Sequence, residues 1–317
     1  MAKISIIVPC YNEREVLPLL YKELNKLALE LSNYDFEFLL VDDGSKDGTL
    51  EELRSLAQKD TRLHYLSFTR NFGKESAIYA GLKSASGDLC VLMDADLQHS
   101  PALLPKMITA IEEEGYDSCA TRRVNRTGEP PIRSFLARQF YKIINKISDI
   151  DLVDGAQDYR IMTRPVVESV LSLSEYNRFS KGIFNWVGYK TKWLECENIE
   201  RPAGETKWSF WKLLKYALSG ITSFTTFPLH LASILGILFL GFAFLRGLIV
   251  FIRNSFFKTQ FSYQTILSFL IGGSQLLSIG ILGQYIAQTD LEVKNRPIYL
   301  CKESNFEVLD SSKGQGI

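Results

Sequence analysis

Cysteine is sparse in this chain and never falls in a short paired motif. The five cysteines among 317 residues are widely scattered, and no two have C-x-x-C spacing. This scatter argues against a disulfide framework and fits reduced thiols on the cytosolic side of a membrane. The cysteines are Cys10, Cys90, Cys119, Cys196 and Cys301.

The sequence also lacks an excess of charge of either sign and an N-terminal signal. Lys plus Arg and Asp plus Glu each number 36, so no global charge favours nucleic acid as a partner. The first apolar run, 4–8, ends at Pro9, and we expect a strand there and not a secretory signal. Hydrophobic residues form 46% of the chain, and the long apolar runs lie in its last third.

The first 122 residues alternate between strand and helix patterns. Such alternation predicts parallel βαβ units, and therefore an α/β fold whose ligands bind outside the carboxyl ends of the strands. We expect strands over 3–8, 36–41, 63–68, 89–93 and 117–120, and helices over 14–31, 47–58, 74–84 and 101–114.

Two carboxylates and an amide follow the fourth expected strand. Asp94, Asp96 and Gln98 are two residues apart, so in an extended segment their side chains point the same way. Oxygen ligands of this kind suit Mg²⁺ or Mn²⁺. An Asp-x-Asp pair is common, however, and these residues could also merely solvate a strand end.

Polar clusters follow all five expected strands, and parallel strands would bring them to one edge. Each alone could be a turn or a helix cap. Five such strand ends around a carboxylate pair favour a ligand site. The clusters are 9–13, 42–49, 70–75, 94–98 and 122–123.

Two apolar segments in the last third are long enough to cross a bilayer. They span 229–252 and 265–287, and a membrane helix needs about 20 residues. Lys and Arg are concentrated outside this pair, so the positive-inside rule places both flanks in the cytosol. Residues 208–224 interleave Trp and Leu with Lys, a pattern that predicts an interfacial amphipathic helix.

Four groups of residues resemble the motifs of family 2 glycosyltransferases, which have a GT-A nucleotide-sugar-binding fold. The chain looks most like the polyprenyl-phosphate glycosyltransferases within that family, a group that includes bactoprenol glucosyltransferases and dolichyl-phosphate mannose synthases. The likeness continues through 158–162, 178–182 and 206–208 into the apolar segments. The four groups are Val8-Pro9-x-Tyr11-Asn12-Glu13, Val41-Asp42-Asp43-Gly44-Ser45, Arg70-Asn71-Phe72-Gly73-Lys74-Glu75 and Asp94-Ala95-Asp96-Leu97-Gln98.

The resemblance implies a role for each of these motifs. Asp94, Asp96 and Gln98 would carry Mg²⁺ or Mn²⁺ and the donor diphosphate, with Asp96 central to catalysis. Asp158 is a hypothesis for sugar orientation or a base-like role, although Gln157 stands before it where the family commonly has glycine. The nucleotide-sugar would contact Pro9, Tyr11, Glu13, Asp42, Lys74 and Asp94.

Cationic residues are concentrated after the fifth expected strand and again before the apolar third. They could form a solvated face, or they could bind a phosphate through charge-assisted hydrogen bonds. Because membrane segments follow, we favour the phosphate of a lipid acceptor. The residues that we expect to bind it are Arg122, Arg133 and Lys207.

The resemblance therefore implies an inverting glycosyltransferase that moves a hexose from a UDP-sugar to undecaprenyl phosphate, with glucose the first choice and N-acetylglucosamine the second. A processive polysaccharide synthase is the alternative enzyme, and a non-catalytic membrane scaffold or transporter is the alternative outside enzymes. We expect a multi-pass inner-membrane protein with cytosolic termini and catalytic domain, a homo-oligomer, and a separate flippase and downstream glycosyltransferase. The expected divisions are a GT-A domain over 1–205, amphipathic helices over 206–226, a transmembrane hairpin over 227–290 and a cytosolic tail over 291–317.

Overall fold

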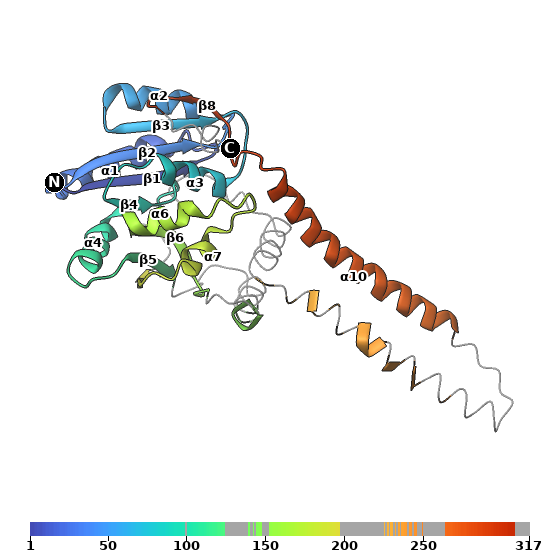
Figure 1. Cartoon of the computed structure of the whole chain (residues 1–317). Helices are drawn as coiled ribbons and strands as arrows, with labels where there is room; N and C mark the ends of the chain where they lie inside the picture. Colours follow the sequence, from blue (N-terminus) through green and yellow to red (C-terminus); the bar gives the residue numbers. More distant parts are fainter. Residues whose placement is uncertain are drawn as a thin grey trace, which may run out of the picture.

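The computed structural model describes residues 1–98, 100–123, 152–196 and 264–307, together with scattered residues in 139–147 and 225–249. Within these ranges most of the elements belong to one α/β unit, with the long helix α10 projecting from it (Figure 1). The strands are β1 (Lys3–Cys10), β2 (Asp35–Asp42), β3 (Leu63–Phe68), β4 (Leu89–Leu92), β5 (Ser118–Arg123), β6 (Ala156–Thr163), β7 (Thr191–Cys196) and β8 (Cys301–Ser304). The helices are α1 (Leu17–Glu30), α2 (Thr49–Lys59), α3 (Lys74–Ser84), the 3₁₀ turn η1 (Pro101–Leu103), α4 (Leu104–Glu112), α6 (Arg164–Ser172), α7 (Ser180–Trp186) and α10 (Gln264–Val293).

One sheet with the strand order β7-β5-β6-β4-β1-β2-β3-β8 forms the centre of this unit. The pairs β1–β2, β1–β4, β2–β3 and β5–β7 are parallel, which confirms the expected α/β fold with a mostly parallel sheet. Strand β6 runs antiparallel between β4 and β5, and β8 runs antiparallel to β3. The alternating sequence pattern did not predict either antiparallel strand.

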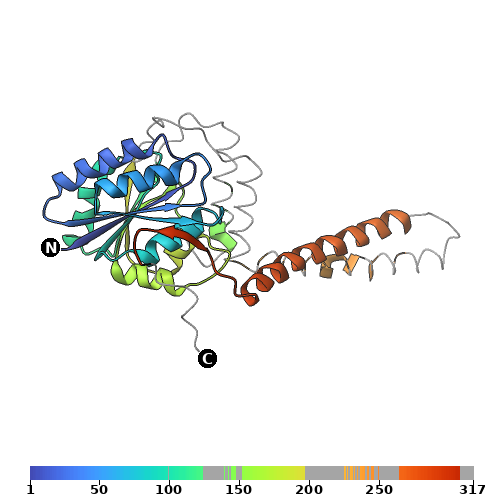
Figure 2. The same ribbon diagram turned by 90° about the horizontal axis from the view of Figure 1, so that it is seen from above.

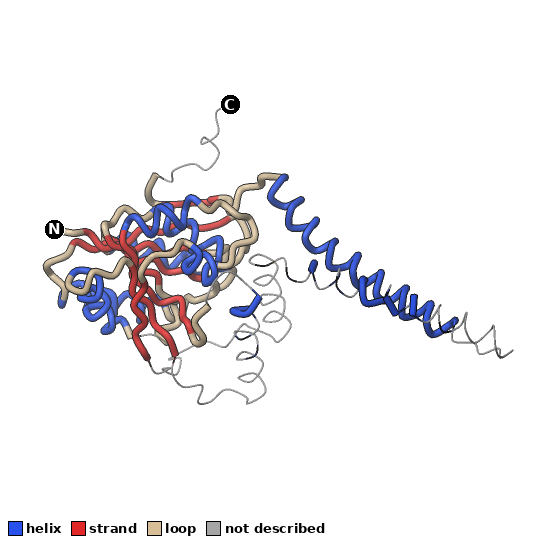
Figure 3. Tube along the Cα trace, turned by 60° about the horizontal axis from the view of Figure 1, so that its bottom comes forward, coloured by secondary structure: helices blue, strands red, loops and turns tan. Residues whose placement is uncertain are grey.

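Helices cover both faces of the sheet and enclose two apolar layers (Figures 2 and 3). Side chains along β1 point alternately to the two faces of the sheet. Ile4, Ile6 and Val8 pack with α1, α2 and α4 on one face, whereas Ile7 packs with α3, α6 and α7 on the other. Both sets are fully buried, as expected for the central strand of a sheet that is covered on two faces. The sheet is thus a rigid support for the loops at its edges.

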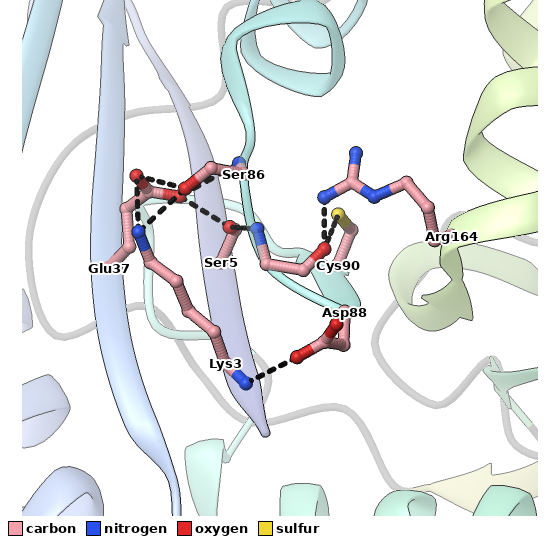
Figure 4. Close-up of polar contacts among 8 residues, drawn as sticks. Lys3, Ser5, Glu37, Ser86, Asp88, Cys90 and Arg164 are labelled. Atoms are coloured by element: carbon pink, nitrogen blue, oxygen red, sulfur yellow. Dashed lines mark hydrogen bonds and ion pairs between the residues drawn. The ribbon is translucent and has the colours of Figure 1, made fainter. Parts of the chain in front are cut away.

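A buried carboxylate ties the amino ends of three strands together at the edge opposite the candidate site (Figure 4). Glu37 on β2 accepts hydrogen bonds from the hydroxyl of Ser5 at 2.5 Å, from the backbone N–H of Ser86 at 3.1 Å and from its hydroxyl at 2.9 Å. The ammonium of Lys3 lies 3.2 Å from the same carboxylate. Nearby, Asp88 accepts the backbone N–H of Lys3 at 2.8 Å. We interpret this network as structural, because the ligand-binding edge of such sheets is the other one.

The chain returns to the catalytic unit after α10. Strand β8 pairs with β3, and the ring of Tyr299 stacks on Phe68 with their centroids 5.0 Å apart. The side chain of Asn305 accepts from the backbone N–H of Tyr65 at 2.8 Å. Residues 303–306, which belong to the expected tail over 291–317, are therefore ordered against the sheet, because β3 offers them a strand edge.

Helix α10 is 30 residues long, which corresponds to about 45 Å. Across the described parts of the chain, residues 270–293 of this helix are the single stretch long and apolar enough to cross a membrane. Its large apolar side chains, such as Leu276 and Ile279, are exposed. The expected segment 265–287 is thus a helix. Of the other expected segment, 229–252, the structure describes only scattered residues, so a second membrane helix is not confirmed.

Candidate active site

Antiparallel pairing of β6 brings Asp158 to the carboxyl edge of the sheet. Leu92 at the end of β4 pairs with Arg160, two residues into β6 from Asp158. Because β6 runs in the opposite direction to β4, the start of β6 lies beside the end of β4. Asp94 and Asp158, which are 64 positions apart in the sequence, therefore face the same space.

The side chain of Lys74 joins these two carboxylates. Its ammonium lies 2.5 Å from an oxygen of Asp94 and 2.5 Å from an oxygen of Asp158. Lys74 is the first residue of α3, and its side chain is 35% exposed. The structure thus brings together three of the residues that the sequence predicted for the site, from three different elements.

Mutual attraction in this triad shifts the pKa values of Lys74 and Asp158. Burial alone would lower the pKa of Lys74, but the charges of Asp158 and then Asp94 raise it well above its usual range. Burial would raise the pKa of Asp158, but Lys74, and next to it Lys181, hold it far below the usual range. At neutral pH Asp158 is therefore ionised and Lys74 is protonated.

Helix α7 supports Asp158 from behind. The ammonium of Lys181 donates to the carbonyl oxygen of Ala156 at 2.8 Å, and its charge acts on Asp158. The start of α7 is held by Glu75, whose carboxylate accepts the backbone N–H of Ser180 at 2.9 Å and also its hydroxyl. Two neighbouring residues of α3 thus hold this side of the site. Lys74 pairs with Asp158, and Glu75 holds the start of α7, the helix that carries Lys181.

A buried arginine, Arg160, follows two residues after Asp158 on β6. The guanidinium of Arg160 lies over the ring of Phe184 on α7, 3.8 Å from its centroid. Arg160 is 2% exposed, and its Nε has no hydrogen-bond partner among the residues that the structure describes. Burial lowers the pKa of Arg160 to about 10, and the charge of Asp158 opposes this shift. Cation–π contact with Phe184 and the negative charge of Asp158 together offset part of the cost of burying this cation.

The Asp94-x-Asp96-x-Gln98 stretch does not continue the strand. Strand β4 ends at Leu92, residues 95 and 96 form a turn, and Leu97 has a left-handed φ of 53°. The argument that alternation points Asp94, Asp96 and Gln98 in one direction is therefore wrong, because it assumes extended backbone. The backbone N–H of Gln98 instead donates to Asp96 at 3.2 Å.

The donor set is nevertheless of the kind that a hard cation takes. Asp94 already accepts a cation, the ammonium of Lys74, at one of its oxygens. Asp96 lies two residues away at the same strand end. Carboxylate oxygens with further ligands from water and a diphosphate are the usual environment of Mg²⁺ or Mn²⁺. In the described part of the chain, no three His, Cys, Asp or Glu side chains are grouped to hold a metal ion.

The loops after β1 and β2 are bound to each other at this edge. The side chain of Asn12 accepts the backbone N–H of Lys46 at 2.9 Å, and the hydroxyl of Ser45 accepts the N–H of Asn12 at 2.8 Å. Gly44 has a φ of 67°, and a Cβ there would lie 2.4 Å from the carbonyl carbon of Arg70. Close approach of the loops after β2 and β3 thus requires glycine at position 44.

Two neighbouring aspartates use their carboxylates inside these loops. Asp42 accepts the N–H of Ser45 at 3.0 Å and the hydroxyl of Ser67 at 2.7 Å. Asp43 accepts the N–H groups of Phe72 and Gly73, and burial raises its pKa to about 6 despite these hydrogen bonds. Pro9, Tyr11 and Glu13 lie at the end of β1 and are partly buried. Nucleotide contact by Asp42 and these three residues stays a prediction.

Of the expected acceptor residues, only Arg122 falls in the described chain. It lies at the end of β5, and its guanidinium is 2.5 Å from the carboxylate of Glu195 on β7. Arg133 and Lys207 lie outside the described residues. Gln157, the departure from the family motif, accepts the thiol of Cys196 at 2.8 Å. The nearby glycine is Gly155, where φ is 78° and a Cβ would meet the carbonyl oxygen of Arg123 at 2.5 Å.

Sequence reasoning assigned no role to Lys181, Glu75 or Asp43. All three belong to motifs that were recognised as stretches, so the signal was present. Their roles depend on contacts between elements, such as Glu75 with Ser180, and these contacts have no local sequence pattern.

Comparison with known proteins gives a family and relatives of nearly the same length. The family described as Glycosyl transferase family 2 matches residues 5–171. CsbB of Bacillus subtilis, a protein named as a glycosyltransferase, is 44% identical over 311 residues, which cover 96% of this chain and 92% of CsbB. The prophage bactoprenol glucosyl transferase homolog of Escherichia coli is 40% identical over 95% of this chain and 98% of its own length. The SfII prophage-derived bactoprenol glucosyl transferase of Shigella flexneri is 41% identical over 96% and 98%, respectively.

Proposed function

The chain belongs to glycosyl transferase family 2, and from this membership we propose that it transfers glucose from UDP-glucose to undecaprenyl phosphate at the cytosolic face of the membrane. That the protein is a glycosyltransferase follows from the family and from full-length relatives. The acceptor class, a polyprenyl phosphate, is supported by the names of relatives that are 40% and 41% identical over almost the whole chain. The choice of glucose and UDP rests on the same names and on the resemblance of the motifs.

The observation that carries the mechanism is the triad of Lys74, Asp94 and Asp158. A glycosyl transfer to a phosphate joins two anions, the acceptor phosphate and the donor diphosphate. A phosphate monoester has a second pKa near ~6, so the acceptor is already a nucleophile at neutral pH and needs no strong base. Positive charge and orientation are then what the protein must supply.

In the proposed reaction, an oxygen of the acceptor phosphate attacks the anomeric carbon of the sugar from the face opposite the diphosphate. The new bond between this oxygen and the anomeric carbon forms as the bond to the diphosphate oxygen breaks, which inverts the anomeric configuration. Electrons of the broken bond leave with UDP. We assign to ionised Asp158 the orientation of the sugar through the hydroxyls of the sugar, and to Lys74 the binding of the leaving diphosphate. The contact between these two residues supports both assignments.

Mg²⁺ or Mn²⁺ bound at Asp94, Asp96 and Gln98 would supply positive charge to the leaving diphosphate. On the acceptor side, Arg122, Arg133 and Lys207 are the proposed phosphate ligands. For Arg122 this requires exchange of Glu195 for the phosphate, since the two residues are paired. Pro9, Tyr11, Glu13 and Asp42 remain the proposed nucleotide contacts.

Strand β8 supports a membrane hairpin. The chain leaves the sheet at β7 and rejoins it at β8, so both ends of the intervening segment lie on one side of any membrane that it enters. An even number of crossings follows, with α10 as one of them and 229–252 as the proposed other. The C-terminal end of α10, which lies next to the α/β unit, is held there because Glu292 accepts the backbone N–H of Tyr176 at 2.9 Å.

Several further assignments complete the proposal. They are the domain divisions given by the sequence, with β8 added to the 1–205 unit, a homo-oligomer, and cytosolic termini at the inner membrane. A flippase and a downstream glycosyltransferase would use the lipid-linked sugar. Each rests on the positive-inside pattern or on the resemblance.

A transfer assay tests the proposed reaction. Full-length protein in detergent is incubated with undecaprenyl phosphate, Mn²⁺ or Mg²⁺ and radiolabelled UDP-glucose or UDP-N-acetylglucosamine, and label in the lipid phase is counted. We expect transfer from UDP-glucose that is abolished by Asp96→Ala. Asp35→Ala is the matched control, because Asp35 is exposed at the start of β2, whereas the candidate site lies at the end of that strand. Intact nucleotide binding without lipid-phase label from either donor would reject the reaction.

A further inference from the structure

We propose that Lys74 occupies the place of the divalent cation at Asp94 in the donor-free protein, and that cation binding moves its ammonium onto the donor diphosphate. This inference rests on the proposed function and concerns the order in which that site is filled. It treats Lys74 as a counter-ion that exchanges between two partners, in addition to a donor contact.

The geometry at Asp94 sets the two cations in competition. The ammonium of Lys74 is 2.5 Å from one oxygen of Asp94. A Mg²⁺ or Mn²⁺ ion binds carboxylate oxygen at about 2.1 Å, so an ion on that same oxygen would lie within about 4.6 Å of the ammonium. Three positive charges would then share one carboxylate, and movement of Lys74 relieves their repulsion.

Lys74 can move without losing its place in the fold. Its backbone is fixed at the first position of α3, but its side chain is 35% exposed, and within the described part of the chain its ammonium pairs with the two carboxylates alone. The lysine side chain has a flexible four-carbon stem and a compact charge, and this combination suits exchange between anionic partners. A diphosphate that arrives with the metal offers such a partner.

Asp158 keeps its charge balance when Lys74 departs. Lys181 stays beside it, because the ammonium of Lys181 is anchored on the carbonyl oxygen of Ala156 at 2.8 Å. Arg160, two residues further along β6, adds a second positive charge that acts on Asp158. Exchange at Lys74 therefore frees Asp94 for the metal without leaving Asp158 as an uncompensated buried carboxylate.

This arrangement predicts that metal and nucleotide bind cooperatively. Without nucleotide, the metal must compete with the Lys74 ammonium for Asp94, so its affinity is low. When the diphosphate is present, the ammonium gains a new partner and the competition ends. Reciprocity of coupling then requires that the metal raise nucleotide affinity by the same factor.

The test measures Mn²⁺ binding, by the electron paramagnetic resonance signal of free Mn²⁺, to the full-length protein with and without UDP. We compare wild type with Lys74→Gln, which removes the charge, and Lys74→Arg, which keeps it. Lys192→Gln is the matched control, because Lys192 pairs with Glu114 outside the site. Without UDP, Lys74→Gln is expected to bind Mn²⁺ at least about tenfold more tightly than wild type, with Lys74→Arg and Lys192→Gln unchanged.

The effect of UDP on wild type is a second measurement, and it does not depend on any variant being folded. UDP is expected to raise the Mn²⁺ affinity of wild type at least about tenfold. Where Lys74→Gln is folded, this factor should be smaller in that variant. An equal Mn²⁺ affinity of Lys74→Gln and wild type without UDP overturns the exchange alone, as does a wild-type affinity that UDP does not change. Failure of wild type to bind Mn²⁺ even with UDP overturns the exchange and the proposed metal site together.

Discussion

Glu303 of the C-terminal strand receives the guanidinium of Arg54 through both of its oxygens, at 2.8 Å and 2.5 Å, although 249 positions separate the two residues. The hydroxyl of Tyr65 donates to the same carboxylate at 2.6 Å. Together these bonds lower the pKa of Glu303 to about 2, with Arg54 as the largest cause. The contact attaches the end of the chain to α2 and β3 of the catalytic unit.

A double-mutant cycle measures what this pair contributes. Both side chains are about one third exposed, so we expect Arg54→Ala and Glu303→Gln each to lower the free energy of unfolding by a small but measurable amount. The double variant should lose clearly less than the sum of the two. Thermal unfolding in detergent gives the three values. Additive losses would mean that the pair has no energy of its own.

Substitution of Glu37 tests the buried network at the amino edge. Glu37→Ala leaves the donors of Ser5 and Ser86 without their acceptor, and we expect a loss of about 3 kcal/mol in urea unfolding at pH 7. The expected transfer activity at saturating substrates is unchanged, because the network lies away from the site. A matched change at an exposed position, Asp35→Ala, should leave stability within about 0.5 kcal/mol.

The same residue predicts a pH dependence of stability. Burial would raise the pKa of Glu37, but hydrogen bonds from Ser5 and Ser86 lower it below 4.5 overall. A carboxyl with a lowered pKa in the folded state stabilises that state above its unfolded pKa, and this contribution is lost as the pH falls. Unfolding free energy of the wild type should thus decrease below about pH 4.5 more steeply than that of Glu37→Gln. Parallel curves for the two proteins would contradict this.

Asp158→Asn is expected to lower turnover at least about 100-fold while nucleotide affinity stays within about threefold. The physical reason is that asparagine keeps the size of the side chain but removes the charge that faces Lys74 and Lys181. Transfer rate and UDP-glucose affinity are measured separately. If turnover stays near wild type with unchanged sugar affinity, Asp158 has no role in the reaction.

Gly44→Ala should damage the site through the backbone. A Cβ at position 44 would lie 2.4 Å from the carbonyl carbon of Arg70, and a φ of 67° disfavours alanine. We expect a loss of about 2–4 kcal/mol in unfolding free energy and weaker UDP binding, since the loops after β2 and β3 must separate. Gly115→Ala is the control, because Gly115 also has a φ of 67° but no atom lies within 4 Å of its Cβ position.

Local patterns in the sequence predicted much of the fold. The bounds 63–68 and 74–84 are those of β3 and α3, because each is a short apolar or amphipathic segment between turn residues. Helix α1 begins at Leu17, three residues after the expected position. Residues 14–16 form a turn before it, because the backbone carbonyl oxygen of Glu13 accepts the N–H groups of Val16 and Leu17. Strands β6 and β8 were missed as parts of the sheet, because their partners lie far away in the sequence.

The sequence predicted which residues belong to the site better than it predicted how they are arranged. Lys74, Asp94 and Asp158 were all named, yet Asp158 was placed only by resemblance, since the antiparallel direction of β6 cannot be read from its own residues. The expected alignment of Asp94 with Asp96 failed because β4 ends at Leu92. Which cations surround Asp158 depends on the packing of α3 and α7 against β6, and this packing is non-local.

The position of β8 sets an order of events during synthesis. Strand β3 gains its last neighbour from residues 301–304, which leave the ribosome only after α10 has been made. Until then, β3 presents an unpaired edge that other strands could join. The apolar helix of the proposed membrane hairpin is therefore made before the sheet is complete, and the sheet gains its final strand only after that helix.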